Sequence, residues 1–230
     1  MAGLQTIIDN CNGIAIDRRK VVGIQTTRNE VARTSETPTF QPWRMSLDMP
    51  ASLRYNNARQ LMEALDVLDR NTPEVVTFSN NACLSWIFKY QGTLTTTQRA
   101  PITVQSFIGN VLTLTNLPAL ASTRVMFKPN DLIQIGNYTY PFTSTTEVTR
   151  GVGTTVQVIT HRPNILSAPT LTGNTLKYGN ECEFKMFCPN MPIYKLVPGG
   201  YQQNSSGTTI NNALVEFSDS FELYEWVATA

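Results

Sequence analysis

The residues of this sequence that could act as nucleophiles or bases are few and widely separated. There is one histidine, His161, and there are four cysteines, Cys11, Cys83, Cys182 and Cys188. Catalysis by a thiol needs a base within hydrogen-bond reach of the sulfur. No local sequence signature places a cysteine beside the histidine. We therefore expect His161 to be an ordinary residue at the end of a strand.

The same side chains do not form a recognisable metal site. None of the cysteines belongs to a CxxC pair, and a zinc site needs four close thiolate or imidazole ligands. Cys182 and Cys188 lie in a run of alternating apolar residues, where a free cysteine behaves as a small core residue. The sequence predicts no metal, no cofactor and no structural disulfide, as in a reducing compartment.

Carboxylates occur in two close pairs. Asp66 and Asp69 are expected on the wet face of a helix, and Glu222 and Glu225 lie near the end of the sequence. A glycosidase pair assembled from distant carboxylates stays open as an alternative. No phosphate-binding glycine motif is present, and the glycines at 199–200 indicate a turn. We predict no catalytic, cofactor-binding or metal-binding residue, and a protein that is not an enzyme.

The composition favours a protein that assembles with other subunits. Charged residues make up 15% of the 230 residues, against roughly 25% in an ordinary soluble domain. The net charge is +1, and the one basic cluster, 17–20, begins with an aspartate. This balance does not favour a nucleic acid or an anionic membrane as partner. No secretory leader is expected, and no run approaches the ~18 apolar residues of a membrane span.

Hydrophobic periodicity predicts a mainly β protein with one helix. The helix is expected at 57–70, where Leu61, Leu65 and Leu68 form an apolar stripe and Asn56 or Asn57 caps the start. The first ten residues are compatible with a further short helix. Other elements in this part are strands at 14–27, 43–49, 75–78 and 84–90, and a polar loop at 29–41.

Residues 93–172 are predicted to form a small inserted β-barrel of the OB-like kind. Short strands separated by turn dipeptides are expected at 102–107, 111–114, 125–127, 132–135, 138–142 and 156–160. Barrels of this size can bind sugars or single strands on an aromatic face. Because no basic residues interleave them, core packing is the favoured interpretation for the candidate aromatics Phe107, Phe127, Tyr138, Tyr140 and Phe142.

The last part of the sequence returns to longer strands. A strand is expected at 182–188, a mobile loop or long turn at 199–212, and a final strand pair or one bent strand at 214–227. Neither 1–92 nor 173–230 contains enough strands to close a core alone. We therefore predict that these two segments form one discontinuous split β-barrel or sandwich domain, which the barrel of 93–172 interrupts.

The order of these elements resembles the structural proteins of phage tails and baseplates, of the type related to distal tail and tail-tube proteins. The turn 128–131 is similar to a proline–glycine–aspartate turn common in virion proteins, with Asn130 in place of the usual glycine. The segments that carry the resemblance are 17–23, 42–43, 61–70, 127–135, 191–198, 214–217 and 221–225.

This resemblance implies a virion protein that forms a closed ring, commonly a hexamer. Such a ring joins the tail tube to the baseplate hub, spike or wedge proteins and leaves a channel through which DNA can pass without specific binding. It is assembled in the host cytoplasm and contacts no membrane. The alternative is a receptor- or carbohydrate-binding virion module that uses the inserted barrel. A hydrolase is the third hypothesis.

Overall fold

The computed structural model describes residues 3–17, 22–26, 32–36, 42–68, 72–80, 82–166, 171–190, 192–198, 201–203, 206, 209–211, 213–218 and 220–227. The chain is mainly β, with 39% strand, 18% helix and a curled antiparallel half-barrel sheet. The predicted fold class is confirmed at this level. The prediction of one helix is wrong, because the described residues contain four α-helices.

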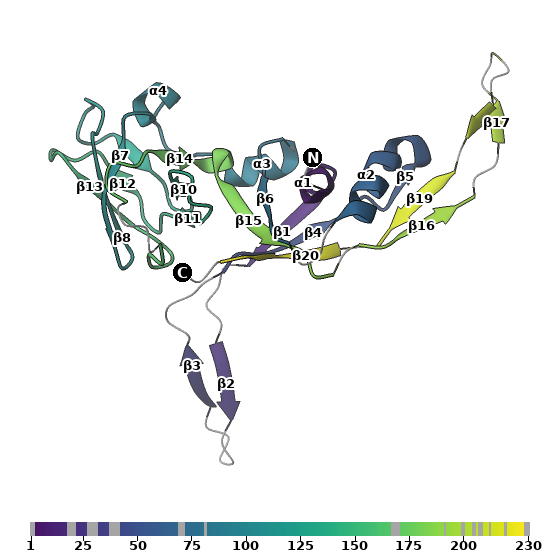
Figure 1. Cartoon of the computed structure of the whole chain (residues 1–230). Coiled ribbons are helices and arrows are strands. Elements are labelled where there is room, and N and C mark those ends of the chain that lie inside the picture. The colour runs from purple at the N-terminus through teal and green to yellow at the C-terminus, as the bar shows by residue number, and fades with distance from the viewer. Residues whose placement is uncertain are drawn as a thin grey trace. The chain divides into compact units, whose positions relative to one another are not determined.

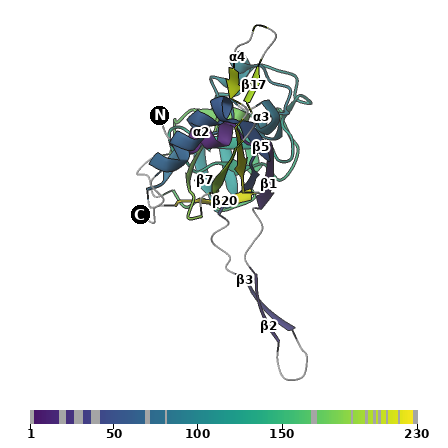
Figure 2. The same ribbon diagram turned by 90° about the vertical axis from the view of Figure 1, so that its right-hand side faces the viewer.

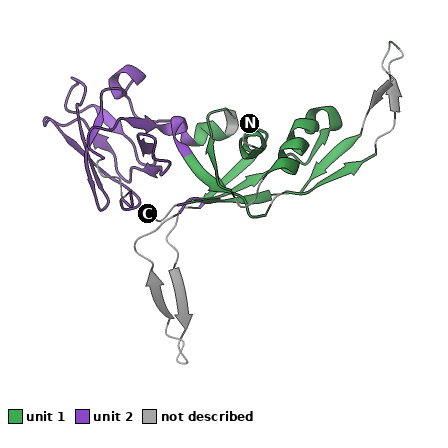
Figure 3. Cartoon of the chain, viewed as in Figure 1, with its two compact units in different colours: residues 1–16, 44–87, 184–226 green, residues 17–43, 88–183, 227–230 purple. Residues whose placement is uncertain are grey.

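The chain divides into two compact units (Figure 3). Unit 1 consists of residues 1–16, 44–87 and 184–226, and unit 2 of residues 17–43, 88–183 and 227–230. The predicted domain bounds, 93 and 172, stay a prediction.

Unit 1 is built on a five-stranded sheet with the strand order β1-β4-β20-β15-β6 (Figure 1). The alternation predicted at 43–49 is confirmed, since Met45 and Leu47 are fully buried while Arg44 and Asp48 are exposed. The strands are Gly13–Asp17 (β1), Arg44–Asp48 (β4), Ser220–Glu225 (β20), Glu183–Phe187 (β15) and Glu74–Thr77 (β6).

A second, three-stranded sheet of unit 1 has the order β16-β19-β5. Its strands are Tyr194–Val197 (β16), Leu214–Phe217 (β19) and Ser52–Arg54 (β5), and both pairings are antiparallel. Of the two alternatives for 214–227, the strand pair is present as β19 and β20, which belong to different sheets.

Helices α1, Gly3–Asp9, and α2, Tyr55–Val67, lie side by side (Figure 1 and Figure 2). The short N-terminal helix is confirmed. The helix predicted at 57–70 is present but begins at Tyr55, so Asn56 and Asn57 do not cap it. Its fully buried stripe is Ala58, Leu61 and Ala64, rotated from the predicted leucine stripe. Burial of one leucine side chain stabilises the fold by roughly 1.5–3 kcal/mol.

The predicted strand 84–90 is wrong, because this segment forms helix α3, Ala82–Phe88. Leu84 and Phe88 are buried, whereas Trp86 is 69% exposed. A spacing of four residues satisfies both a strand alternation and one helical turn, and over seven residues the two patterns cannot be separated.

Two segments predicted as loops contain antiparallel ribbons instead. Within 29–41, strand β3, Ala32–Glu36, pairs with β2, Val22–Thr26. Within 199–212, strand β17, Tyr201–Gln203, pairs with β18, Thr209–Asn211. Each ribbon is a two-stranded sheet.

Unit 2 contains two three-stranded sheets, β13-β8-β7 and β11-β10-β14, and the pair β12-β9. Most predicted strands are present, but the one expected at 138–142 is reduced to β11. The elements are Thr96–Arg99 (α4), Thr103–Ile108 (β7), Val111–Thr115 (β8), Val125–Phe127 (β9), Leu132–Ile135 (β10), Phe142–Thr143 (β11), Val148–Thr149 (β12), Val156–Ile159 (β13), Leu176–Tyr178 (β14) and the 3-10 turn Gly179–Glu181.

The edges of these sheets are linked to one another. The bridge between Thr103 and Thr175 joins the edge of β7 to the segment before β14. The bridge between Ser144 and Thr160 joins the end of β11 to the end of β13. One hydrophobic core fills the unit, with Ile102, Leu114, Phe127 and other apolar side chains fully buried.

Within the described residues, no helix combines the length and the apolar character that crossing a membrane requires.

Candidate functional site

The cysteines do not supply a reactive thiolate among the described side chains. Cys182 and Cys188 are buried, as predicted for core residues. Cys11 is buried as well, and the side chain of Cys83 lies outside the described residues. The Cys11 thiol donates a hydrogen bond to Ile7 O at 3.2 Å. Burial raises the pKa of Cys11 to about 12 and also raises the pKa of Cys182. Because only the thiolate is nucleophilic, both thiols are inert at neutral pH.

The single histidine has a structural role. Thr143 N donates a hydrogen bond to His161 Nδ1 at 2.9 Å, and the imidazole packs edge-on against Trp43 with ring centroids 5.3 Å apart. An accepting Nδ1 places the proton of the neutral ring on Nε2. His161 thus joins β11 to the residues after β13, in agreement with its predicted position at a strand end.

Of the two carboxylate pairs, Glu222 and Glu225 do not come together in the structure. Asp66 accepts a hydrogen bond from the Tyr194 hydroxyl at 3.2 Å, and Asp69 lies outside the described residues. Glu222 forms an exposed ion pair with Arg44 at 2.5 Å. Glu225 is buried, because residues three apart in a strand point to opposite faces. The described residues contain no group of three or more acidic, histidine or cysteine side chains that could hold a metal ion.

The five candidate aromatics of unit 2 are core residues, as favoured from the sequence. Phe107, Phe127, Tyr140 and Phe142 are buried, and Tyr138 packs against the core. They therefore do not form an exposed aromatic face for sugars or bases.

Two buried polar side chains of unit 2 were missed in the sequence. The Arg162 guanidinium is fully buried, lies 3.4 Å from the centroid of the Tyr140 ring and donates to Pro141 O at 2.5 Å. The Asp131 carboxylate is 1% exposed and accepts from Gln91 N at 2.7 Å and Lys128 N at 2.8 Å. Lys128 lies three residues from Asp131, whereas Gln91 and Pro141 are distant in the chain from the side chains that they contact. Local spacing could not predict these distant contacts.

Some of the exposed apolar side chains lie on strands. Ile108 is opposite Val111, which is opposite Ile159, and these three side chains are 76%, 36% and 47% exposed. Directly opposed residues in a sheet share a face. Strands β7, β8 and β13 contain no charged residue. Their outer face therefore presents an uncharged apolar row, which we call the β7-β8-β13 row.

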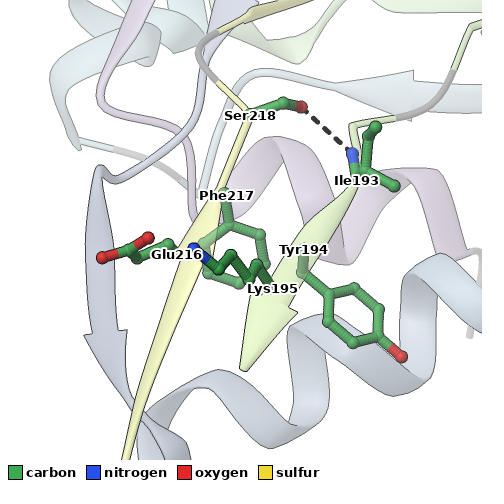
Figure 4. A pocket seen from close by; sticks show the side chains of 6 residues that line it. All are labelled: Ile193, Tyr194, Lys195, Glu216, Phe217 and Ser218. Carbon is green, nitrogen blue, oxygen red and sulfur yellow. Dashed lines mark hydrogen bonds between the residues drawn. The ribbon is translucent and has the colours of Figure 1, made fainter. Parts of the chain in front are cut away.

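A second exposed apolar surface lies on β16 in unit 1. Ile193 is 77% and Leu196 55% exposed. A hollow of about 350 Å³ lies beside Ile193 (Figure 4), where Ser218 Oγ accepts a hydrogen bond from Ile193 N at 3.0 Å. It is lined by Ile193, Tyr194, Lys195, Glu216, Phe217 and Ser218. This surface is a strand at the end of its sheet, not an enclosed pocket.

Comparison of the sequence with models of protein families and with curated proteins gave no match.

Proposed function

We propose that this protein is a structural, ring-forming component of a phage tail, at the baseplate hub or the distal end of the tail tube. It is not an enzyme in this proposal, and it needs no cofactor. Its partners are further copies of itself, commonly six in a ring, together with tail-tube and baseplate proteins. In this setting the protein is part of the virion and is assembled in the host cytoplasm.

The observation that carries the proposal is the amount of sheet edge and apolar strand surface left without cover among the described residues. Ribbons β2-β3 and β17-β18 are two-stranded, and β16 ends its sheet. A two-stranded ribbon is marginally stable alone, and an uncovered edge invites pairing with another chain. A closed ring covers such edges with one heterologous contact repeated around an axis.

The finer fold belongs to the same proposal. We propose that unit 1 is a split β-barrel or sandwich and that unit 2 is a small OB-like barrel inserted into it. The bridges at Thr103 and Ser144, which join the edges of the two three-stranded sheets of unit 2, support the small barrel.

Electron microscopy and mass measurement of the purified chain test the proposed function. We expect closed rings with one stoichiometry, six copies being the commonest form in the family that the sequence resembles. A chain that stays monomeric at high concentration, and is not found in rings in assembled tails, would overturn the proposal.

The second candidate function is binding of a receptor or glycan by unit 2, and the β7-β8-β13 row is the observation that favours it. Next to the apolar row, Ser106, Thr113 and Gln157 form a row of uncharged polar side chains. Loss of glycan-array binding in Gln157→Ala and Ile159→Ser would favour this function. Absence of binding by the unmodified chain would eliminate it.

A further inference from the structure

The hydrogen bonds of β16 fix the direction of its backbone groups. Ser218 N donates to Ile193 O at 2.9 Å, so this pair belongs to the hydrogen-bonded set of the ladder. Such pairs alternate with non-hydrogen-bonded pairs. In the register Lys195–Glu216 and Leu196–Val215, Lys195 therefore directs its N–H and C=O to β19. Those of Tyr194 and Leu196 point away from β19.

The pairing of β19 with β5, on its other side, agrees with this alternation of hydrogen-bonded pairs. Tyr55 N donates to Ala213 O at 3.0 Å, so Ala213 directs its backbone groups toward β5. By alternation Val215 does the same, and Leu214 and Glu216 are left to pair with β16. No described residue pairs with the outward backbone groups of Tyr194 and Leu196.

Three other sheet edges, at β7, β13 and β6, are covered by described residues. In unit 2, Val104 N donates to Asn174 O beside β7, and Thr145 N donates to Ile159 O beside β13. In unit 1, the Gln5 side chain bonds both backbone groups of Thr77 on β6. Strand β1 also ends a sheet, but none of the exposed large apolar side chains lies on it. The β16 edge combines outward backbone groups with exposed apolar side chains and the neighbouring hollow.

The β2-β3 ribbon has only two strands among the described residues. It has five residue pairs, Val22–Glu36 to Thr26–Ala32, and no third described strand. Strand β2 contains no charged residue. Strand β3 contains Arg33 and Glu36. An apolar strand suits the β16 edge better than a charged one, because strand addition combines backbone hydrogen bonds with pockets for alternate side chains.

We propose that β2 of one copy adds as a strand to the β16 edge of a second copy. The two strands lie in different sheets of the same chain and do not pair there. Each copy then offers two different surfaces, β2 and β16, which makes the contact heterologous and repeatable around a ring. The inference rests on the proposed ring function and names the contact that builds it.

The direct test removes one backbone donor. Leu196→Pro deletes an outward N–H and leaves the bonds of β16 to β19 in place, since proline is tolerated on edge strands whose N–H faces outward. The matched control, Leu196→Ala, shortens the same side chain and keeps the N–H. We expect the proline variant to lose about tenfold or more of the assembled fraction and the alanine variant about threefold or less. Equal losses, or assembly of the proline variant at the level of the unmodified chain, would overturn the inference.

A crosslinking test does not depend on the fold of the proline variant. Full-length Ile24→Cys is mixed with full-length Leu196→Cys under mild oxidation, and we expect a disulfide-linked heterodimer. The control pairs Leu196→Cys with Val152→Cys, whose position in unit 2 is 96% exposed. A heterodimer that forms no faster than in the control overturns the pairing. If rings form without this crosslink, the pairing of β2 with β16 is refuted and the proposed ring function stands. If the crosslink forms but no rings are found, the pairing stands and the proposed ring function is refuted.

Discussion

The side-chain amide of Gln5 pairs with both backbone polar groups of Thr77, as a neighbouring strand would. Gln5 Nε2 donates to Thr77 O at 2.9 Å, and Thr77 N donates to Gln5 Oε1 at 2.8 Å. Thr77 is the last residue of β6, which ends the five-stranded sheet. Helix α1 therefore blocks strand addition at this edge of unit 1.

Replacement of Gln5 by alanine is expected to open the β6 edge. Two hydrogen bonds to half-buried backbone groups are lost, and we expect the free energy of unfolding to fall by about 1–2 kcal/mol. Urea denaturation measures this loss, and light scattering should show more irregular association than in the unmodified chain. Gln60→Ala, at an exposed position of α2, is the matched control. Equal stability of the two variants would contradict the role of Gln5.

Asp131 is expected to make the stability of the fold depend on pH in the direction opposite to that of most carboxylates, whose pKa is lowered by folding. Burial raises the pKa of its carboxyl group above the ordinary value, although hydrogen bonds from Lys128 and Gln91 oppose this. A raised pKa means that the folded chain holds the proton more tightly than the unfolded chain. The contribution of the titration to stability is therefore present below the unfolded pKa and lost as the pH rises through the folded pKa.

The variant Asp131→Asn tests this sign. At neutral pH an amide NH2 group replaces one carboxylate oxygen and faces the N–H of Gln91 or Lys128, so that two donors oppose each other. We expect the free energy of unfolding to fall by about 1–3 kcal/mol. The difference from the unmodified chain should grow as the pH is lowered through the range between the unfolded and the raised folded pKa, because only the aspartate gains from protonation. Urea titrations at several pH values measure it, with the exposed Glu147→Gln as control. A difference that shrinks on acidification would refute the raised pKa.

The sequence predicted the parts of the fold in which one pattern continues long enough to be unambiguous. The alternation of Trp43 to Met49 and the apolar residues of 57–70 gave a strand and a helix that the structure confirms. The seven residues from Leu84 failed because the two periodicities coincide over that length. Strand β3 was missed because residues 29–41 show no hydrophobic alternation, and the strand is defined by its pairing with β2.

The separation of Glu222 from Glu225 was accessible from the sequence, and the long-range buried polar contacts were not. Glu222 and Glu225 differ by an odd number of residues in a strand, which alone places them on opposite faces. The contact from Gln91 to Asp131 joins residues 40 positions apart, and that from Trp43 to Pro141 joins residues 98 apart. Such contacts depend on the whole fold of unit 2, so local spacing could not predict them.

Arg162 is expected to be the most sensitive charged residue of unit 2. Its guanidinium stacks on Tyr140 and donates to Pro141 O, to which Trp43 Nε1 also donates at 2.8 Å. Lysine cannot reproduce the planar stacking. We expect Arg162→Lys to lower the free energy of unfolding by about 2–4 kcal/mol. Arg59→Lys, on the exposed face of α2, should change it by less than about 0.5 kcal/mol. Urea denaturation curves of both variants measure these changes. Equal losses of unfolding free energy would contradict the structural role of Arg162.

The backbone conformation at Asn130 accounts for an asparagine at the position where the similar virion-protein turn has glycine. Its φ is 73°, in the left-handed region that glycine and asparagine adopt more readily than other residues. We expect Asn130→Gly to keep the stability within about 0.5 kcal/mol, because glycine has no Cβ to be strained at this φ. Asn130→Ala should lose about 1–2 kcal/mol, because alanine keeps the strained Cβ and lacks the short polar side chain with which asparagine can hydrogen-bond locally. Thermal and urea unfolding of the two variants measure the difference. Both shorten the same side chain, so each controls for lost side-chain contacts, and an alanine variant as stable as the glycine variant would show that the backbone of this turn is not constrained.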